Sequence, residues 1–316
     1  MKKLLQILIP TLNREESLIR NLRNIQQYIL DNDLSEKVGV IISDNGSTYD
    51  SYAKLYSFVK NYITIDVSCY HQNENIGIEQ NILFLLDRAE SEYVMTLGDD
   101  DYFTEQYLLI SLSYLEKGNY TGIIPNFYLI DAKGEKINTF NYREPIQDDQ
   151  IYDRKSLWIS IRGHQLSCII FKLEGVAESY RKNVHPNAYP FIYFIAYNLS
   201  RGKMILVTRE PFACTMIPKK NWDYSFDNLM GDIACVIDAL PYENKTEKMH
   251  QLQVMVRNEV KRFCNEETIK HPFRLFKQIS RYECSRLTRL IIIEQYFMQR
   301  LRRIKWKIKE ICTGRV

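Results

Sequence analysis

Three consecutive carboxylates, Asp99, Asp100 and Asp101, follow a short apolar run at Tyr93 to Leu97. Adjacent like charges repel each other by roughly 1 to 4 kcal/mol per close pair, depending on the local dielectric. A hard divalent cation such as Mn²⁺ or Mg²⁺ relieves that repulsion and leaves coordination positions open for phosphate oxygens. We therefore predict a metal site at these three residues that holds a diphosphate. The alternative is the start of a helix near Thr104, because Asp is favoured in a first helical turn.

Runs of β-forming residues alternate with segments of helical periodicity in the first part of the chain. The runs lie at Leu4 to Ile9, Val38 to Ser43, Ile63 to Cys69, Tyr93 to Leu97 and Ile123 to Ile130. Such alternation predicts an α/β fold with a mostly parallel sheet flanked by helices. The order becomes less regular after Ile130, where we expect mixed strands that include a run at Leu166 to Phe171.

Polar, turn-forming residues follow the first three runs as well as the fourth. In open α/β sheets, ligands bind outside the carboxyl ends of the strands, so these loops are where a site is expected. Each loop taken alone is ordinary turn chemistry. The candidate ligand-binding residues are Pro10, Thr11, Asn13 and Arg14 in the first loop, Asp44 and Asn45 in the second, and Asn75 and Gly77 in the third.

Length and composition indicate a globular chain. The chain has 316 residues, of which 45% are hydrophobic and 26% charged, which is enough for a large core. A net charge of +3 is small for this size and gives no reason to expect nucleic-acid binding. Seven cysteines without paired metal-type spacing argue against a disulfide framework and a zinc site, and favour a reducing compartment. No apolar stretch reaches the length of a transmembrane helix, and the N-terminal run is too short for a signal peptide.

The ordered set of loops resembles the nucleotide-sugar-binding half of family 2 glycosyltransferases, which have the Rossmann-related GT-A fold. Members carry a Pro-Thr-x-Asn-Arg loop, an Asp-x-Gly-Ser turn, an Asn-x-Gly loop and an Asp-x-Asp motif in that order. The match covers residues 4 to 120, about a third of the chain. The resemblance implies that Thr11 and Asp44 contact the base and ribose of a nucleotide diphosphate sugar. Arg14 and Asn75 would line the same side.

Two departures from the family pattern affect this assignment. Asn81 falls where an Arg-Asn pair is common and is a candidate donor contact, but Gln80 replaces the Arg. Gly98 stands where the usual Leu-Asp-x-Asp-Asp has its first Asp, while the three aspartates offer a second Asp-x-Asp one residue later, so the register stays open. The string Leu-Gly-Asp-Asp-Asp-Tyr at residues 97–102 resembles an abequosyltransferase-like branch, which adds dideoxyhexoses or related sugars to cell-surface oligosaccharides.

The catalytic base is less clear. Asp100 is expected to act through the metal, which neutralises the departing diphosphate. An inverting transferase also needs a base, and family members place Asp or Glu before a helix in the second half; the corresponding stretch here, residues 183–191, has no carboxylate. His185 is the substitute, with a surface histidine as the alternative. Asp149 is a second candidate or a helix-cap residue. His164 and Trp222 are candidate acceptor contacts, or a structural histidine and a packing residue.

The C-terminus predicts a basic amphipathic helix over residues 290–311. Apolar residues recur there at steps of three or four, and residues 286–316 contain nine Lys or Arg against two Glu. One interpretation is peripheral contact with an anionic membrane surface. The other is a helix docked on the catalytic domain or on a partner subunit.

We expect a metal-dependent glycosyltransferase that moves a sugar from a nucleotide diphosphate sugar to a lipid-linked or other cell-surface oligosaccharide, at the cytoplasmic face of the cell membrane. The expected catalytic domain spans residues 1–215, with a nucleotide-sugar-binding half (1–120) and an acceptor half (121–215), and residues 216–316 form a helical extension. No nucleic-acid partner is expected, and a homo-oligomer is left open. The alternatives are an inactive nucleotide-sugar-binding or membrane scaffold protein and a sugar-phosphate nucleotidyltransferase, although the latter's Gly-rich first loop is missing here.

Overall fold

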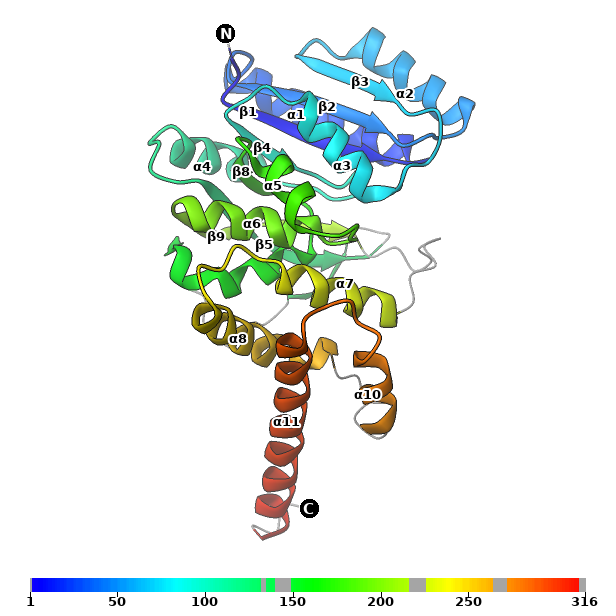
Figure 1. Cartoon of the computed structure of the whole chain (residues 1–316). Coiled ribbons are helices and arrows are strands. Elements are labelled where there is room, and N and C mark those ends of the chain that lie inside the picture. The colour runs from blue at the N-terminus through cyan, green and yellow to red at the C-terminus, as the bar shows by residue number, and fades with distance from the viewer. Residues whose placement is uncertain (1, 132–134, 140–148, 216–225, 264–271, 313–316) are drawn as a thin grey trace.

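A computed structural model describes residues 2–131, 135–139, 149–215, 226–263 and 272–312, and confirms the α/β architecture. Its strands form one mixed sheet in the order β3-β2-β1-β4-β8-β5-β9-β7, with β6 paired to β5 (Figure 1). The elements of the first half are β1 (Leu5–Thr11), α1 (Glu15–Asp31), β2 (Val38–Asp44), α2 (Tyr49–Tyr62), β3 (Val67–His71), α3 (Gly77–Arg88), β4 (Tyr93–Thr96) and α4 (Glu105–Leu115).

The second half contributes the antiparallel part of the sheet and one face of helices. Its elements are β5 (Gly122–Ile130), β6 (Lys136–Thr139), β7 (Gln150–Tyr152), the 3₁₀ helix η1 (Arg154–His164), β8 (Ile169–Lys172), α5 (Val176–Asn183), α6 (Pro190–Arg201) and β9 (Met204–Thr215). Strand β8 runs antiparallel to both β4 and β5, while β9 runs parallel to β5. The expectation of mixed strands after Ile130 is therefore confirmed.

Each face of the sheet carries its own apolar core, because alternate strand residues point to opposite sides. In β1, Leu8 packs with α3, α6 and η1, whereas Ile7 and Ile9 pack with α1, α2 and α4. Such burial on both faces explains why the strands read as continuous apolar runs in the sequence. The helical periodicity of α1 is also confirmed, since its buried apolar residues are Leu18, Leu22, Ile25 and Ile29.

Two strands begin later than their apolar runs. Strand β3 starts at Val67 because Ile63 still belongs to the end of α2, where its amide donates to the carbonyl of Val59. Strand β8 starts at Ile169 because Cys168 has a positive φ of 63°, which is incompatible with extended backbone. In both cases the first residue of the strand is set by local backbone geometry, which cannot be inferred from residue type alone.

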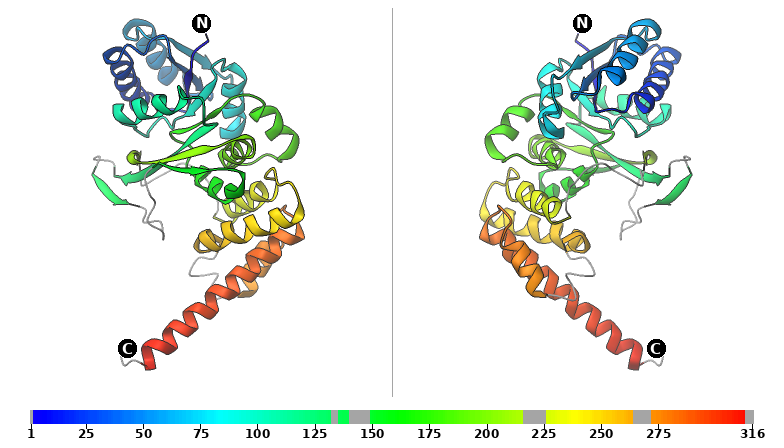
Figure 2. Two further views of the ribbon diagram at one scale, coloured as in Figure 1. Left: turned by 90° about the vertical axis from the view of Figure 1, so that its left-hand side faces the viewer. Right: turned by 90° about the vertical axis from the view of Figure 1, so that its right-hand side faces the viewer.

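The helices after β9 are partly joined to the part of the chain that contains the sheet. These helices are α7 (Phe226–Asp238), α8 (Lys245–Phe263), α10 (Pro272–Ile279) and α11 (Arg286–Cys312). Buried residues of α7, α8 and the start of α11 share one core with α6 and η1, and Gln251 of α8 hydrogen-bonds the backbone of Lys155 and Trp158. Beyond its first turns, α11 projects away from the body of the protein (Figures 1 and 2). No helix in the described ranges is both long and apolar enough to cross a membrane.

Candidate functional site

Four polar side chains line up along the carboxyl edge of the parallel strands. Thr11 and Asp44 are register partners at the ends of β1 and β2, and Asp44 is in turn the partner of His71 at the end of β3. On the other side of Thr11, its Oγ1 donates a 2.8 Å hydrogen bond to Oδ2 of Asp99, which follows β4. The sheet order thus produces a row Asp99, Thr11, Asp44, His71 over four adjacent strands.

The three loops behind this row are cross-linked by asparagine side chains. The backbone amide of Asn13 donates to Ser47 Oγ at 2.7 Å, and Asn13 Oδ1 accepts from the amide of Thr48 at 2.8 Å. Asn45 joins the second loop to the third, because its Nδ2 donates to Asn75 Oδ1 at 2.9 Å and its Oδ1 accepts from the amide of Ile76. The loops are therefore held in place by three residues that the sequence predicts as ligand-binding: Asn13, Asn45 and Asn75.

Gly46 closes the second loop against the third and admits no side chain. Its φ is +77°, and a Cβ there would lie 2.5 Å from the carbonyl carbon of Glu74. We expect Gly46→Ala to lower the free energy of unfolding by about 3 kcal/mol, from positive φ together with the backbone clash. Gly118→Ala is the matched control, because Gly118 also has a positive φ (+68°) but nothing lies within 4 Å of its Cβ position. It should cost about 1 kcal/mol. Urea unfolding measures both, and equal losses would contradict the clash.

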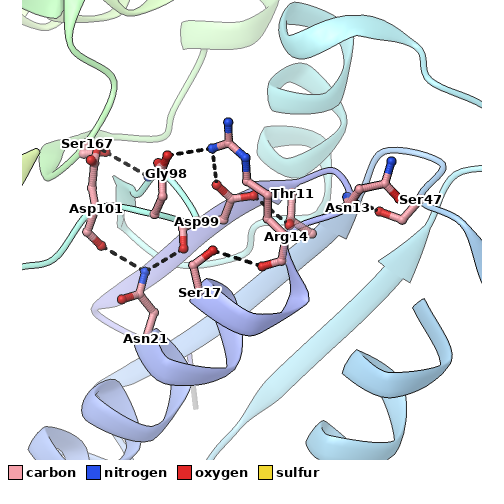
Figure 3. Close-up of polar contacts among 11 residues, drawn as sticks. Thr11, Asn13, Arg14, Ser17, Asn21, Ser47, Gly98, Asp99, Asp101 and Ser167 are labelled. Carbon is pink, nitrogen blue, oxygen red and sulfur yellow. Dashed lines mark hydrogen bonds and ion pairs between the residues drawn. The ribbon is translucent and has the colours of Figure 1, made fainter. Parts of the chain in front are cut away.

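The acid cluster is organised around one guanidinium group (Figure 3). Nη1 of Arg14 lies 3.0 Å from Asp99 Oδ1 and 2.7 Å from Asp100 Oδ2, so two carboxylates converge on one cationic nitrogen. Asn21, buried in α1, donates its Nδ2 to the carbonyls of Asp99 and Asp101 at 3.1 and 2.9 Å. The backbone of the cluster is thereby fixed from α1. Sequence reasoning missed Asn21, whose only signal was a polar residue on the apolar face of a helix.

The third aspartate also bonds across to the segment before β8, and its place among the predicted metal ligands stays a prediction. Oδ2 of Asp101 accepts from Ser167 Oγ at 2.5 Å, and the same hydroxyl oxygen accepts from the amide of Gly98 at 2.9 Å. A Cβ at Gly98 would lie 3.0 Å from that Oγ, so glycine suits the position where the family usually has Asp. Ser167, which sequence reasoning missed, lies just before β8, where the antiparallel part of the sheet begins beside β4. Its hydroxyl therefore reaches Asp101.

Burial makes the first aspartate hard to ionise. Desolvation, with repulsion from Asp100, raises the pKa of Asp99 to about 6, although Arg14 and the Thr11 hydroxyl act in the opposite direction. Desolvation alone would lower the pKa of Arg14, but Asp99 and Asp100 outweigh it and raise that pKa. The cluster thus holds more negative charge than its own cation neutralises in a buried setting. It is suited to receive a further cation.

The donor set fits a divalent cation held by two residues. Within the described ranges, no group of three or more His, Cys, Asp or Glu side chains is placed to hold one metal ion. Mg²⁺ is usually bound by one or two carboxylates together with phosphate oxygens and water, which Asp99 and Asp100 match. Because both carboxylates already contact Arg14, a bound cation and this guanidinium would compete for the same oxygens.

Asn81 is buried and bonded to β2, and its role as a contact of the donor sugar nucleotide stays a prediction. The residue is 1% exposed, its Oδ1 accepts from Ser43 Oγ at 2.6 Å and its Nδ2 donates to the carbonyl of Ser43 at 3.1 Å. It therefore ties α3 to β2. Pro10 is likewise buried within β1, while Gly77 has a φ of +81° at the start of α3 and donates its amide to Asn75 Oδ1.

The predicted catalytic and acceptor residues lie apart from one another. His185 is exposed in the loop between α5 and α6. Asp149 pairs with Arg209 at 3.3 Å, at the β9 side of the sheet. His164 ends η1, where its Nδ1 lies 2.9 Å from the carbonyl of Ile161 and its ring meets Phe127 edge to face. Trp222 lies outside the described residues.

Two carboxylates do reach the loop before α6, although its own sequence has none. Oε1 of Glu79, from α3, accepts from the amide of Asn187 at 2.9 Å and from Tyr180 Oη at 2.5 Å. Oδ2 of Asp232, from α7, accepts from the amide of Ala188 at 3.1 Å. Burial raises the pKa of Asp232, and the nearby Glu79 charge adds to the effect. Sequence reasoning missed both because they come from distant helices.

The family is decided by a match that covers more than half of the chain. The family model for glycosyl transferase family 2 matches residues 6–174, which include the row of strand ends and the acid cluster. The chain belongs to glycosyl transferase family 2. This membership confirms the resemblance that the ordered loops predict.

Two curated proteins share part of this family 2 sequence. The abequosyltransferase RfbV of Salmonella typhimurium is 26% identical over 157 residues, which are 47% of this chain and 43% of that protein. An uncharacterized protein of Haemophilus influenzae is 27% identical over 109 residues, 34% of this chain and 56% of that protein. The chain spans about half the length of the curated relatives it matches.

Solved structures establish the fold of this family 2 chain as GT-A. S. aureus TarS residues 1–349, in complex with UDP-GlcNAc, superposes with a TM-score of 0.64 at 14% identity and covers 94% of this chain and 89% of that one. The mannosyltransferase PcManGT from Pyrobaculum calidifontis, in complex with GDP-Man and Mn²⁺, has a TM-score of 0.55 at 11% identity and covers 89% and 75%. At these identities the similarity concerns the fold.

Proposed function

We propose that this chain transfers a sugar from a nucleoside diphosphate sugar to an oligosaccharide acceptor. The observation that carries the proposal is the row from Asp99 to His71 at the carboxyl edge of four parallel strands, with two carboxylates and Arg14 at one end. A nucleoside diphosphate has its phosphates at one end and a flat base at the other, which matches a row that has a guanidinium between two carboxylates at one end and an imidazole ring at the other.

The chain's own residues bind and orient the donor in this proposal. Arg14 offers a guanidinium to phosphate oxygens, and a divalent cation held by Asp99 and Asp100 would neutralise the charge that develops on the departing diphosphate. Thr11, fixed by its bond to Asp99, stands next along the row toward the sugar and ribose. The asparagine cross-links keep the loops rigid, so little ordering is left for the binding step.

Asp232 is the carboxylate we favour as acceptor for the proton of the attacking hydroxyl. It reaches the loop where family members carry their own acid, and its raised pKa suits proton transfer. Glu79 is less suited, because Tyr180 and Asn187 both hydrogen-bond its Oε1. His185 stays a prediction as the alternative base, since it is exposed in the same loop.

Product analysis tests the proposed activity. The chain would be incubated with UDP-, GDP-, CDP- and dTDP-sugars and a membrane-lipid extract as acceptor, with and without Mn²⁺. We expect metal-stimulated release of one nucleoside diphosphate together with incorporation of the sugar into lipid. Binding without release would favour the inactive scaffold, whereas pyrophosphate consumption or release would favour the nucleotidyltransferase.

We also propose that α11 brings this site to an anionic membrane surface. The start of the helix is docked, since Ile291, Ile292 and Tyr296 are buried against the helical extension. Further along, Leu301 and Ile304 are 53% and 50% exposed, beside exposed Arg302 and Lys305. Apolar side chains among basic ones suit the interface of an anionic bilayer.

Vesicle co-sedimentation tests this contact. The double variant Leu301→Asn with Ile304→Asn should reduce binding to vesicles that contain phosphatidylglycerol by about tenfold, because it removes two exposed apolar side chains from the proposed contact. The pair Leu30→Asn with Ile137→Asn changes exposed apolar residues elsewhere and is the control. Equal binding by both variants and the unchanged chain would overturn the membrane proposal without affecting the transferase proposal.

A further inference from the structure

At the β3 end of the row, both carboxylate oxygens of Asp44 are already hydrogen-bonded. Its Oδ1 accepts hydrogen bonds from the amide and hydroxyl of Ser47, and its Oδ2 lies 2.7 Å from Nδ1 of His71. The side chain of Asp44 is 1% exposed, whereas that of His71 is 31% exposed. A ligand that binds at this end of the row therefore contacts the imidazole of His71 before the carboxylate of Asp44.

The imidazole is held in one orientation with one polar atom left over. Its ring lies against that of Tyr52, with centroids 4.1 Å apart and planes at 32°, while Asp44 holds Nδ1. Because a carboxylate accepts, we assign to Nδ1 the proton of the bond with Asp44, and in that tautomer Nε2 is an acceptor. No described residue hydrogen-bonds that Nε2. Burial, with a smaller effect of neighbours that include Asp44, raises the pKa of Tyr52, so its hydroxyl stays protonated.

The direction of the sheet decides which end of a donor reaches His71. The parallel strands β1, β2 and β3 follow β4 in the sheet, and all end at this edge. His71, at the end of β3, is three strand spacings from the acid cluster at the end of β4, which is about 14 Å. On the other side of β4, the antiparallel β8 presents its start, where Ser167 contacts Asp101. If the diphosphate binds at the acid cluster, the nucleobase therefore lies on the β3 side of it.

We propose that His71 recognises the nucleobase of the donor, with Nε2 accepting a hydrogen bond from a ring N–H. Uracil, thymine and guanine carry such an N–H, whereas the corresponding ring nitrogen of cytosine or adenine is an acceptor. Asp44 is then a positioning residue that fixes the tautomer and orientation of His71. The inference rests on the proposed function, because it assigns the donor's base within the same site.

The substitution His71→Asn separates the two roles of the histidine. The amide nitrogen of Asn is bonded to Cγ as Nδ1 is, so His71→Asn keeps a donor toward Asp44 but presents nothing in place of Nε2. Calorimetry with UDP, dTDP, GDP and CDP in Mn²⁺ should show that one of the first three binds tightest. The variant should weaken that ligand about tenfold, the effect of one hydrogen bond to a fixed partner, and change CDP binding less than twofold.

Two controls make the outcome specific. His250→Asn alters an exposed histidine on α8 and should leave every affinity unchanged. The thermal midpoint of His71→Asn should stay within about 2 °C of the unchanged chain, so that lost affinity is not lost structure. Tightest binding of CDP, or unaltered affinities in His71→Asn, would overturn the inference alone. Failure of the unchanged chain to bind any of the four would overturn the proposed function instead.

Discussion

Replacement of Asp100 by asparagine is expected to weaken metal-dependent binding of the nucleoside diphosphate at least a hundredfold, which is about 2.7 kcal/mol. Asp100 is one of the two carboxylates that converge on Arg14, and the neutral amide is a poor ligand for a hard cation. Without the second carboxylate, Asp99 alone would have to hold the ion, and burial already disfavours its charged form. Calorimetric titration with Mn²⁺ present measures the loss.

A matched substitution controls for the change of charge. Asp33→Asn removes one negative charge from an exposed residue after α1, whose φ of 53° asparagine tolerates well, and should bind the diphosphate normally. The circular dichroism spectra of both variants should match that of the unchanged chain. If Asp100→Asn binds the diphosphate and Mn²⁺ as tightly as Asp33→Asn does, Asp100 is not a metal ligand.

The second prediction with a large effect concerns the stability of the fold, which the substitution should increase. Asp99→Asn should raise the free energy of unfolding by about 3 kcal/mol at pH 7.5, while removing metal-dependent binding. The pKa of Asp99 is about 6 in the folded chain and near 3.8 without the fold, so its ionisation disfavours folding by about 1.36 kcal/mol for each of roughly two pH units. The amide has no such charge and keeps an oxygen that can accept from Arg14.

The pH dependence gives this prediction its sign. Between about pH 4 and pH 6 the folded state holds the Asp99 proton more tightly than the unfolded state, so this residue's contribution to stability falls as the pH rises through that window. Urea unfolding at pH 4 and pH 7.5 should therefore show little difference between Asp99→Asn and the unchanged chain at the lower pH, and the full gain at the higher. A loss of stability at pH 7.5 would mean that the bond to Arg14 outweighs desolvation. A site that destabilises its own fold is expected where function requires buried charge.

Residue pattern was sufficient for the elements and for the edge where the site lies. Strands β1, β2, β4 and β5 start within one residue of their predicted runs, because each is apolar on both faces and ends at a polar loop. The grouping of Thr11, Asp44 and the acid cluster also follows from sequence, since the carboxyl ends of parallel strands share one edge. The family's ordered motifs added the kind of ligand.

Long-range contacts explain what the sequence did not predict. The pairing of Arg14 with Asp99 and Asp100 spans more than eighty residues, and the turn of Asp101 toward Ser167 depends on the antiparallel placement of β8. The bonds of Asn81 to Ser43 likewise join positions 38 residues apart in the chain. Glu79 and Asp232 supply the acid that the loop before α6 lacks only because α3 and α7 meet there.

Calorimetric titration of the unchanged chain with UDP, GDP, CDP and dTDP, each with and without Mn²⁺, tests the central claim most directly. The row from Asp99 to His71 predicts tight binding of one diphosphate, at least tenfold tighter with Mn²⁺ than without, and a preference for a base with a ring N–H. Binding of none of the four, with or without the metal, would contradict a nucleoside diphosphate site at this edge of the sheet.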